Sequence, residues 1–254
     1  MVKLEKIGVQ MYTVRDFLDT EENVKRTFEK IKALGYDEIQ TASRYISFEA
    51  LGRIAREAGL TIVGTHDDFW QMYNEPEVAM ENHRLLDTKI MGIGGFFEKT
   101  VESYESFIEK ANVIAKNVGP HGFKFSYHHH SHEFIKYDGK TIMDLLVEKL
   151  DPNYTSFVLD TYWVQHGGGD VRYWIEKLAG RIDILHLKDM KRVDDAEKPH
   201  IYTEVGNGNL YWEGILETAV KTGVKSFIVE QDVCPGDPFE SLKMSSDYLH
   251  ANFM

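Results

Sequence analysis

The sequence predicts an α/β protein folded as a (β/α)8 barrel, the TIM-barrel fold. Eight short runs rich in β-branched and aromatic residues alternate along the 254 residues with longer stretches of helical periodicity. The first seven runs begin 24 to 34 residues apart, enough for one strand, one helix and their turns. Strands that alternate with helices indicate a parallel sheet, and eight such units in about 250 residues are typical of a closed barrel. A doubly wound sheet is the alternative, but GVQMYTVRD after the first run has no glycine-rich phosphate loop.

The predicted strands are five to seven residues long, and most follow a glycine or a polar turn. They cover residues 7–11, 36–40, 60–66, 89–95, 123–129, 156–160, 182–188 and 226–231.

The predicted helices lie between these strands. In the first, Val24, Phe28 and Ile31 share one face, and Gly35 ends the helix. The same reasoning predicts helices over 22–34, from 48 up to the glycine at 59, and over 77–87, 101–118, 141–149, 170–178, 211–222 and 238–252.

No low-complexity or Pro/Ser-rich linker divides the chain, so we expect a single barrel domain over residues 1–254. The last two strands begin 44 residues apart, which predicts an insertion of about fifteen residues after the seventh strand.

The composition narrows the function. The 29 basic and 41 acidic side chains give a net charge of −12, which argues against binding to nucleic acid or to an anionic membrane surface. We see neither an apolar run long enough to span a membrane nor a signal peptide. The single cysteine, Cys234, allows no intrachain disulfide, so we expect a cytoplasmic protein.

Ionisable side chains follow four consecutive predicted strands. Asp160, His186 and Glu230 lie at the ends of strands six, seven and eight, and strand five runs into His128-His129-His130 and on to Glu133. Functional side chains of a TIM barrel lie at the carboxyl ends of its strands, so these groups should face one mouth.

Carboxylates gathered in one cavity repel each other and lose hydration, and a divalent cation offsets both costs. The sequence therefore predicts a metal site formed by Glu133, Asp160, His186 and Glu230. One imidazole and three carboxylates suit Mn²⁺ first, with Mg²⁺, Co²⁺ or Zn²⁺ as alternatives. Taken singly, Asp160 and Glu230 also fit helix N-caps, and His186 fits a hydrogen-bonded core residue.

At these residues the sequence resembles the sugar-phosphate isomerase/epimerase superfamily with the xylose-isomerase-like barrel, which includes ketose 3-epimerases, hydroxypyruvate isomerase and inosose dehydratase. The matching segments are GVQMYTVRD from Gly8, YHHH from Tyr127 to Glu133-Phe134, DTYW from Asp160, HLKD from His186 and VEQD from Val229. The resemblance implies one metal ion held by Glu133, Asp160, His186 and Glu230. The strand-five ligand is either Glu133 or His128, which stands at the strand end itself. Trp163 departs from the epimerases, which have a substrate-contacting histidine there.

The chemistry expected from this resemblance is abstraction of a proton α to the carbonyl of a keto sugar or cyclitol by the paired glutamates Glu133 and Glu230. Isomerisation or epimerisation is the first expectation. Dehydration or lyase chemistry is the alternative, and a non-catalytic sugar-binding or partner subunit is the third possibility. We expect a small-molecule substrate and allow for a homo-oligomer. The substrate-binding residues expected around it are Gln10, His66, His128, His130, Trp163 and Lys188.

Overall fold

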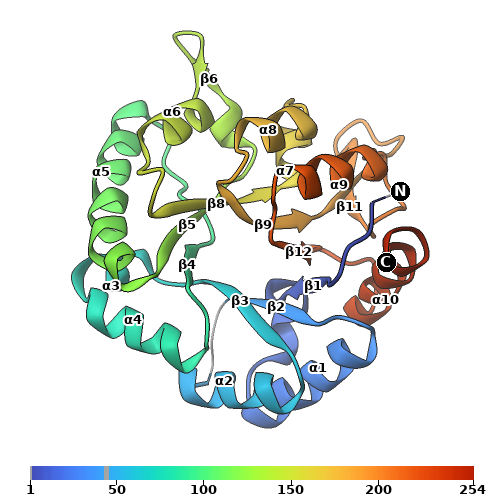
Figure 1. The fold of residues 1–254 in the computed structure, drawn as a ribbon. Helices are drawn as coiled ribbons and strands as arrows, with labels where there is room; N and C mark the ends of the chain where they lie inside the picture. Colours follow the sequence, from blue (N-terminus) through green and yellow to red (C-terminus); the bar gives the residue numbers. More distant parts are fainter. Residues whose placement is uncertain (1, 43–45) are drawn as a thin grey trace.

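A computed structural model describes residues 2–42 and 46–254. Eight parallel strands form a ring with helices around its outside, as Figure 1 shows. The strands of the ring are β1 (Gly8–Gln10), β2 (Glu38–Ala42), β3 (Thr61–His66), β4 (Ile90–Ile93), β5 (Lys124–His128), β8 (Thr155–Asp160), β9 (Ile182–Leu187) and β12 (Ser226–Val229). Each overlaps one of the predicted strands, so the predicted α/β TIM barrel is confirmed.

The barrel is nearly closed. The hydrogen-bonded ladder runs β3-β2-β1-β12-β9-β8-β5-β4, which leaves β3 and β4 as its two ends. These ends meet: the Asp67 amide, just after β3, donates a 2.8 Å hydrogen bond to the Gly92 carbonyl of β4. A Cβ atom at Gly92 would lie 2.3 Å from the Thr65 carbonyl oxygen, so only glycine permits this approach.

The longer helices lie where the sequence predicts them. They are α1 (Glu21–Ala33), α2 (Phe48–Glu57), α4 (Pro76–Leu85), α5 (Val101–Val118), α6 (Ile142–Lys149), α8 (Val171–Lys177), α9 (Trp212–Lys221) and α10 (Pro238–Phe253). Side chains cap several of them: Thr20, Ser47 and Thr100 each accept a hydrogen bond from an amide in the first turn.

The loops hold elements that the sequence pattern did not predict. They are the 3-10 helices η1 (Met11–Phe17), η2 (Gly119–His121) and η3 (His132–Phe134), the short helices α3 (Phe69–Asn74) and α7 (Thr161–His166), and the hairpin of β6 (Lys136–Tyr137) and β7 (Lys140–Thr141). That hairpin projects beyond the ring of helices (Figure 1). The insertion expected after the seventh strand contains a second hairpin, formed by β10 (Asp189–Arg192) and β11 (His200–Thr203).

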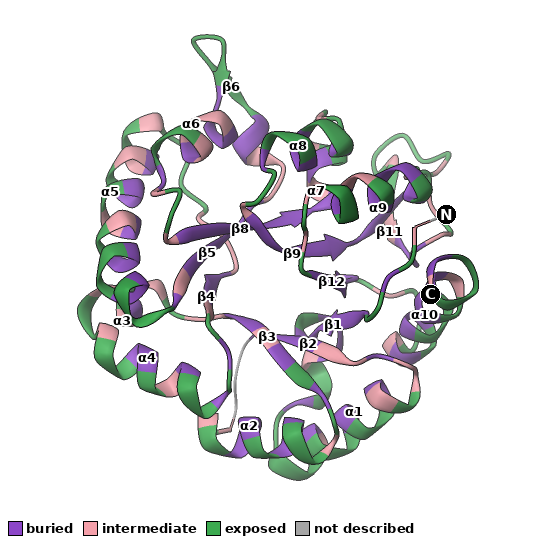
Figure 2. Ribbon diagram, in the orientation of Figure 1, coloured by how far each residue is buried: buried purple, intermediate pink, exposed green. Residues whose placement is uncertain are grey.

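Burial follows the barrel geometry. The strands and the inner faces of the helices are buried, whereas the outer helix faces are exposed (Figure 2). The large core between strands and helices is accompanied by a small separate cluster of Val158, Ile184 and Ile228, with Val63 and Ile90 against it. Among the residues described, no helix is long and apolar enough to cross a lipid bilayer.

Candidate metal centre and substrate pocket

The period of the strands places the site one layer above the small apolar cluster. Val158, Ile184 and Ile228 each stand two residues before an ionisable residue, namely Asp160, His186 and Glu230. Because residues i and i+2 of a strand share one face, the three ionisable side chains point into the same space as the apolar ones. The strands thus pass from an apolar to an ionisable layer toward their carboxyl ends.

Four buried side chains meet in this layer. One ligand atom from each of His128, Asp160, His186 and Glu230 lies within 4.8 Å of the others. Nε2 of His128 is 3.5 Å from Oδ2 of Asp160, and Nδ1 of His186 is 3.0 Å from Oε2 of Glu230 and 3.7 Å from Oδ2 of Asp160.

Hydrogen bonds outside the cluster orient both imidazoles. The Gly94 carbonyl accepts from Nδ1 of His128 at 3.1 Å, which leaves Nε2 as the lone-pair nitrogen toward Asp160. Oε1 of Gln40 accepts from Nε2 of His186, which points Nδ1 toward the carboxylates. Gln10 supports this arrangement, because its amide group donates to the same Gln40 oxygen at 2.9 Å. Metal-binding histidines commonly hold their second nitrogen in this way.

Three atoms of the cluster lack hydrogen-bond partners although they are buried: Nε2 of His128, Oδ2 of Asp160 and Nδ1 of His186. Buried polar atoms normally have partners, so three unpartnered atoms aimed at one another indicate that this cluster can bind a cation. Burial alone lowers the pKa of His186, but Glu230 and Asp160 outweigh it and raise that pKa. The centre therefore attracts positive charge, and two imidazoles with two carboxylates are a donor set for a divalent metal ion.

Asp160 serves two elements at once. Its Oδ1 accepts a 2.9 Å hydrogen bond from the Trp163 amide and caps α7, while Oδ2 faces the cluster. The N-cap interpretation and the metal-ligand interpretation of Asp160 are therefore compatible.

Lys188 neutralises the carboxylates beside this centre. Its Nζ lies 3.0 Å from Glu230, 3.4 Å from Asp160 and 2.6 Å from Asp232, and the side chain is buried. Burial disfavours each charge, yet the Lys188 ammonium and the imidazoles hold the pKa of Asp160 and Glu230 well below their ordinary values. The same carboxylates overcome the effect of burial on Lys188 and raise its pKa, so the lysine carries its proton.

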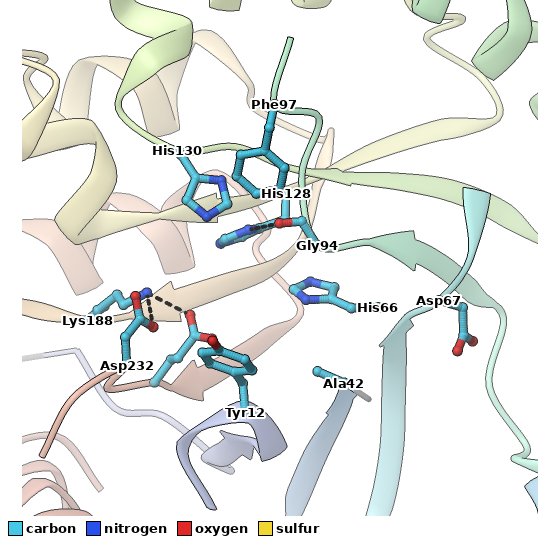
Figure 3. Close-up of a pocket in the computed structure, with 11 residues that line it drawn as sticks. Tyr12, Ala42, His66, Asp67, Gly94, Phe97, His128, His130, Lys188 and Asp232 are labelled. Atoms are coloured by element: carbon cyan, nitrogen blue, oxygen red, sulfur yellow. Dashed lines mark hydrogen bonds and ion pairs between the residues drawn. The ribbon is translucent and has the colours of Figure 1, made fainter. Parts of the chain in front are cut away.

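A pocket of about 350 Å³ opens over these groups. Figure 3 shows Phe97 and His130 on one side and Tyr12 on the other, with His66 pointing toward His128 between them. Its lining is completed by Ala42, Asp67, Gly94, Lys188, Glu230 and Asp232.

Glu133 lies outside the cluster. Its Oε1 accepts from the Tyr127 hydroxyl at 2.7 Å and its Oε2 from the His130 amide at 2.9 Å, and the side chain is fully buried. The structure thus brings together His128, and not Glu133, with the three other expected ligands. The turn of η3 after β5 carries the Glu133 carboxylate back beneath the histidine segment.

The expected substrate-binding residues divide into two groups. His66, His128, His130 and Lys188 line the pocket. Burial, with His128 and His186 nearby, lowers the pKa of His66, whose Nε2 has no partner. Gln10 and Trp163 instead support the lining. Gln10 donates a hydrogen bond to Gln40. The centroid of the Trp163 ring lies 5.0 Å from the centroid of the His130 ring and 5.1 Å from Nζ of Lys188.

Sequence reasoning missed Asp232, Gln40 and Phe97 as site residues. Asp232 had a usable signal, because it is a second carboxylate only two residues after Glu230, just past the end of β12. Gln40, in the middle of β2, resembled any buried amide, and Phe97 lies in a loop without periodicity.

The model of the family described as Xylose isomerase-like TIM barrel matches residues 28–248. The chain belongs to this family.

The chain is also similar to individual proteins, in sequence to some and in fold to others. Inosose dehydratase from Mesomycoplasma hyopneumoniae (strain 7448) is 27% identical over 168 residues, which cover 60% of this chain and 55% of that protein. The chain thus spans about half the length of the curated relatives that it matches first. A sugar phosphate isomerase/epimerase from Parabacteroides distasonis superposes with a TM-score of 0.80 at 21% identity, over 98% of this chain and 95% of that one.

A further member, a xylose isomerase-like TIM barrel protein from Mycobacterium smegmatis described in complex with magnesium, has a TM-score of 0.71 at 13% identity, over 96% of this chain and 95% of the other. The buried cluster of two imidazoles and two carboxylates thus lies in a barrel of the xylose isomerase-like family.

Proposed function

We propose that the protein is a divalent-metal-dependent dehydratase, which removes the proton next to the carbonyl of a keto sugar or keto cyclitol and then eliminates water. The observation that carries this proposal is the Lys188 ammonium, buried between Glu230 and Asp232 on the wall of the pocket. A carboxylate base of the metal centre and an ammonium acid thus stand side by side. Similarity to inosose dehydratase supports the same reaction class.

His128, Asp160, His186 and Glu230 would hold the metal ion. When bound, the ion polarises the substrate's carbonyl and so acidifies the neighbouring C–H. With two imidazoles in the set, Mn²⁺, Co²⁺ and Zn²⁺ suit the site better than Mg²⁺, and Mn²⁺ remains our first choice.

The chain's own residues then complete an elimination. The Glu230 carboxylate takes the α-proton, and the electron pair of that C–H bond becomes the new C=C bond as the β C–O bond breaks. Lys188 gives a proton to the departing hydroxyl, which leaves as water. Because Nζ of Lys188 lies 3.0 Å from Oε2 of Glu230, the proton on Glu230 returns directly to the lysine, and both groups regain their starting charge.

Isomerisation and epimerisation share the first step and are the alternative. Two-base epimerisation needs acid–base groups on opposite faces of the substrate. The second glutamate expected for that role, Glu133, is bonded to Tyr127 and to the His130 amide, and Asp232 shares Lys188 with Glu230. His66 lies across the pocket, but burial lowers its pKa and keeps its ring neutral. The geometry therefore favours elimination over two-base epimerisation.

The test incubates the manganese-loaded protein with an inosose in deuterated water and follows loss of water by mass spectrometry. We expect the dehydrated product, and we expect Lys188→Met to lower its rate by about 10²–10⁴-fold while Glu230 still exchanges the α-proton. Lys188→Arg, which keeps a cation, should retain more activity than Lys188→Met. Deuterium uptake without any loss of water would support isomerisation or epimerisation instead, and no exchange with any keto sugar or inosose would favour a non-catalytic binding protein.

Two further inferences rest on composition alone. The single cysteine fits a reducing compartment, so we place the protein in the cytoplasm. The net charge of −12 argues for a small-molecule substrate rather than nucleic acid.

A further inference from the structure

A second and larger cavity adjoins the substrate pocket. It has a volume of about 540 Å³ and lies between the loop after β4 and the β6–β7 hairpin. Phe97 lines both cavities. A volume of this size holds a small organic group.

Phe97 stands at the junction of the two cavities. Its side chain is 67% exposed, and its ring lies 4.9 Å from His130 of the pocket and 5.7 Å from His132 of the second cavity. The loop before Phe97 packs closely against His130. Gly95 in that loop has φ +138, and a Cβ atom there would lie 2.9 Å from the His130 ring, so the loop requires glycine at this position. An aromatic ring thus stands at the edge of a polar pocket (Figure 3), and it is exposed and also lines the neighbouring cavity.

The wall of the second cavity presents mainly carbon to its interior. Its aliphatic members are Ile135 and Ile142. Its aromatic members use their polar atoms within the protein: the hydroxyl of Tyr104 and Nε2 of His132 both bond the Phe96 carbonyl at 2.9 Å, and the Tyr137 hydroxyl donates to the Lys99 carbonyl at 2.9 Å. Glu98 and Lys99 also line the cavity, and both are exposed residues. The carbon-rich remainder of the wall favours an apolar occupant over a second sugar, which would need hydrogen-bonding groups around it.

We propose that the second cavity binds an apolar substituent, of the aryl type, attached to the sugar or cyclitol that occupies the substrate pocket. This inference rests on the proposed function for the pocket, and it extends the substrate class from bare keto sugars to substituted ones. The sugar lies over Lys188 and the metal centre, and its substituent passes Phe97 and packs against Tyr104, Ile135 and Tyr137. The exposed Phe97 ring then becomes part of the contact surface.

The test compares the affinities of phenyl β-D-glucopyranoside and methyl β-D-glucopyranoside for the full chain by calorimetry. We expect the phenyl compound to bind at least about tenfold more tightly, since a buried aromatic ring contributes more than the ~1.4 kcal/mol that this factor requires. Ile135→Trp should abolish the difference, because it fills the cavity from a position that is 52% exposed and tolerant of a larger side chain. Val220→Trp, on α9, is the matched control at a 42% exposed position and should leave the difference intact.

Equal affinities, or no binding of the phenyl compound, would overturn the inference. So would a phenyl preference that survives Ile135→Trp, because the ring would then bind elsewhere. An oligomer that Ile135→Trp dissociates, with both affinities unchanged, would assign the cavity to a second copy of the chain. Because these measurements concern binding, they are independent of the proton-exchange assay, whose failure alone would remove the proposed function.

Discussion

The residue that decides how the metal centre is built is the one contributed by β5. His128 offers an unpartnered nitrogen to the cluster, whereas both oxygens of Glu133 are already hydrogen-bonded. We therefore expect His128→Gln to weaken manganese binding by at least about 100-fold, because it removes a ligand and not merely a group that orients one.

Glu133→Gln should keep one metal ion per chain and lose about 1–3 kcal/mol of stability, since an amide replaces an acceptor of two hydrogen bonds. Metal content after dialysis and urea unfolding measure the two effects. The reverse result, with metal lost in Glu133→Gln and retained in His128→Gln, would restore Glu133 as the ligand.

The same pair of residues shows why individual positions were only partly predictable. Asp160, His186 and Glu230 could be placed because each directly ends a strand and the period of two fixes its face. Glu133 comes five residues after the end of β5, and its position depends on how η3 turns. No periodicity describes such a turn. Hydrogen bonds to Tyr127 and to the His130 amide, visible only in three dimensions, draw the carboxylate away from the cluster.

Strand β9 carries ionisable residues near both of its ends, Asp183 at its start and His186 at its end. Asp183 allows a test of what stabilises the fold. Asp183 is buried there between Lys225 at 2.5 Å and Lys124 at 3.1 Å, so it ties β9 to the segments that begin β12 and β5. Burial raises the pKa of Asp183, but the two lysines outweigh it and bring the pKa below its ordinary value of 3.8. A carboxyl whose pKa is lower in the folded state stabilises the fold above its unfolded pKa, and that stability is lost as the pH falls through the folded pKa.

We therefore expect Asp183→Asn to lower the free energy of unfolding by about 1–3 kcal/mol at pH 7. The difference from the unsubstituted protein should remain constant down to about pH 4 and shrink below it, as urea unfolding at a series of pH values would show. Asp247→Asn is the control, because its pair with Lys243 is exposed to solvent and should contribute far less to stability. A difference that does not change between pH 7 and pH 3 would mean that the carboxylate charge plays no part.

At the level of elements, regular structure was predictable and irregular structure was not. Strands and long helices repeat with periods that the apolar residues reveal, so all eight strands and the helices around them were found. The β6–β7 hairpin has two-residue strands that are mostly exposed, and α7 and η3 are too short to show a period. His132 of η3 and Tyr137 of β6 line the second cavity, and Phe97 lies in an irregular loop, so neither Phe97 nor this cavity could be foreseen from periodicity.

The whole molecule brings the metal centre together, since its four side chains come from residues 128 to 230 and meet only when β5, β8, β9 and β12 stand side by side. An unfolded chain cannot hold these groups at one point, so a bound metal ion must stabilise the folded barrel by linkage. A free metal concentration 1,000-fold above the dissociation constant would contribute about 4.1 kcal/mol. At about 2–4 °C per kcal/mol for a chain of this size, manganese should raise the Tm by about 8–16 °C, and a chelator should reverse the rise.

Asp160→Asn is the sharpest control, because asparagine still caps α7 at the Trp163 amide but removes the carboxylate charge from the cluster. The variant should fold with its Tm no longer dependent on manganese, whereas an equal rise in both proteins would place the metal elsewhere on the chain.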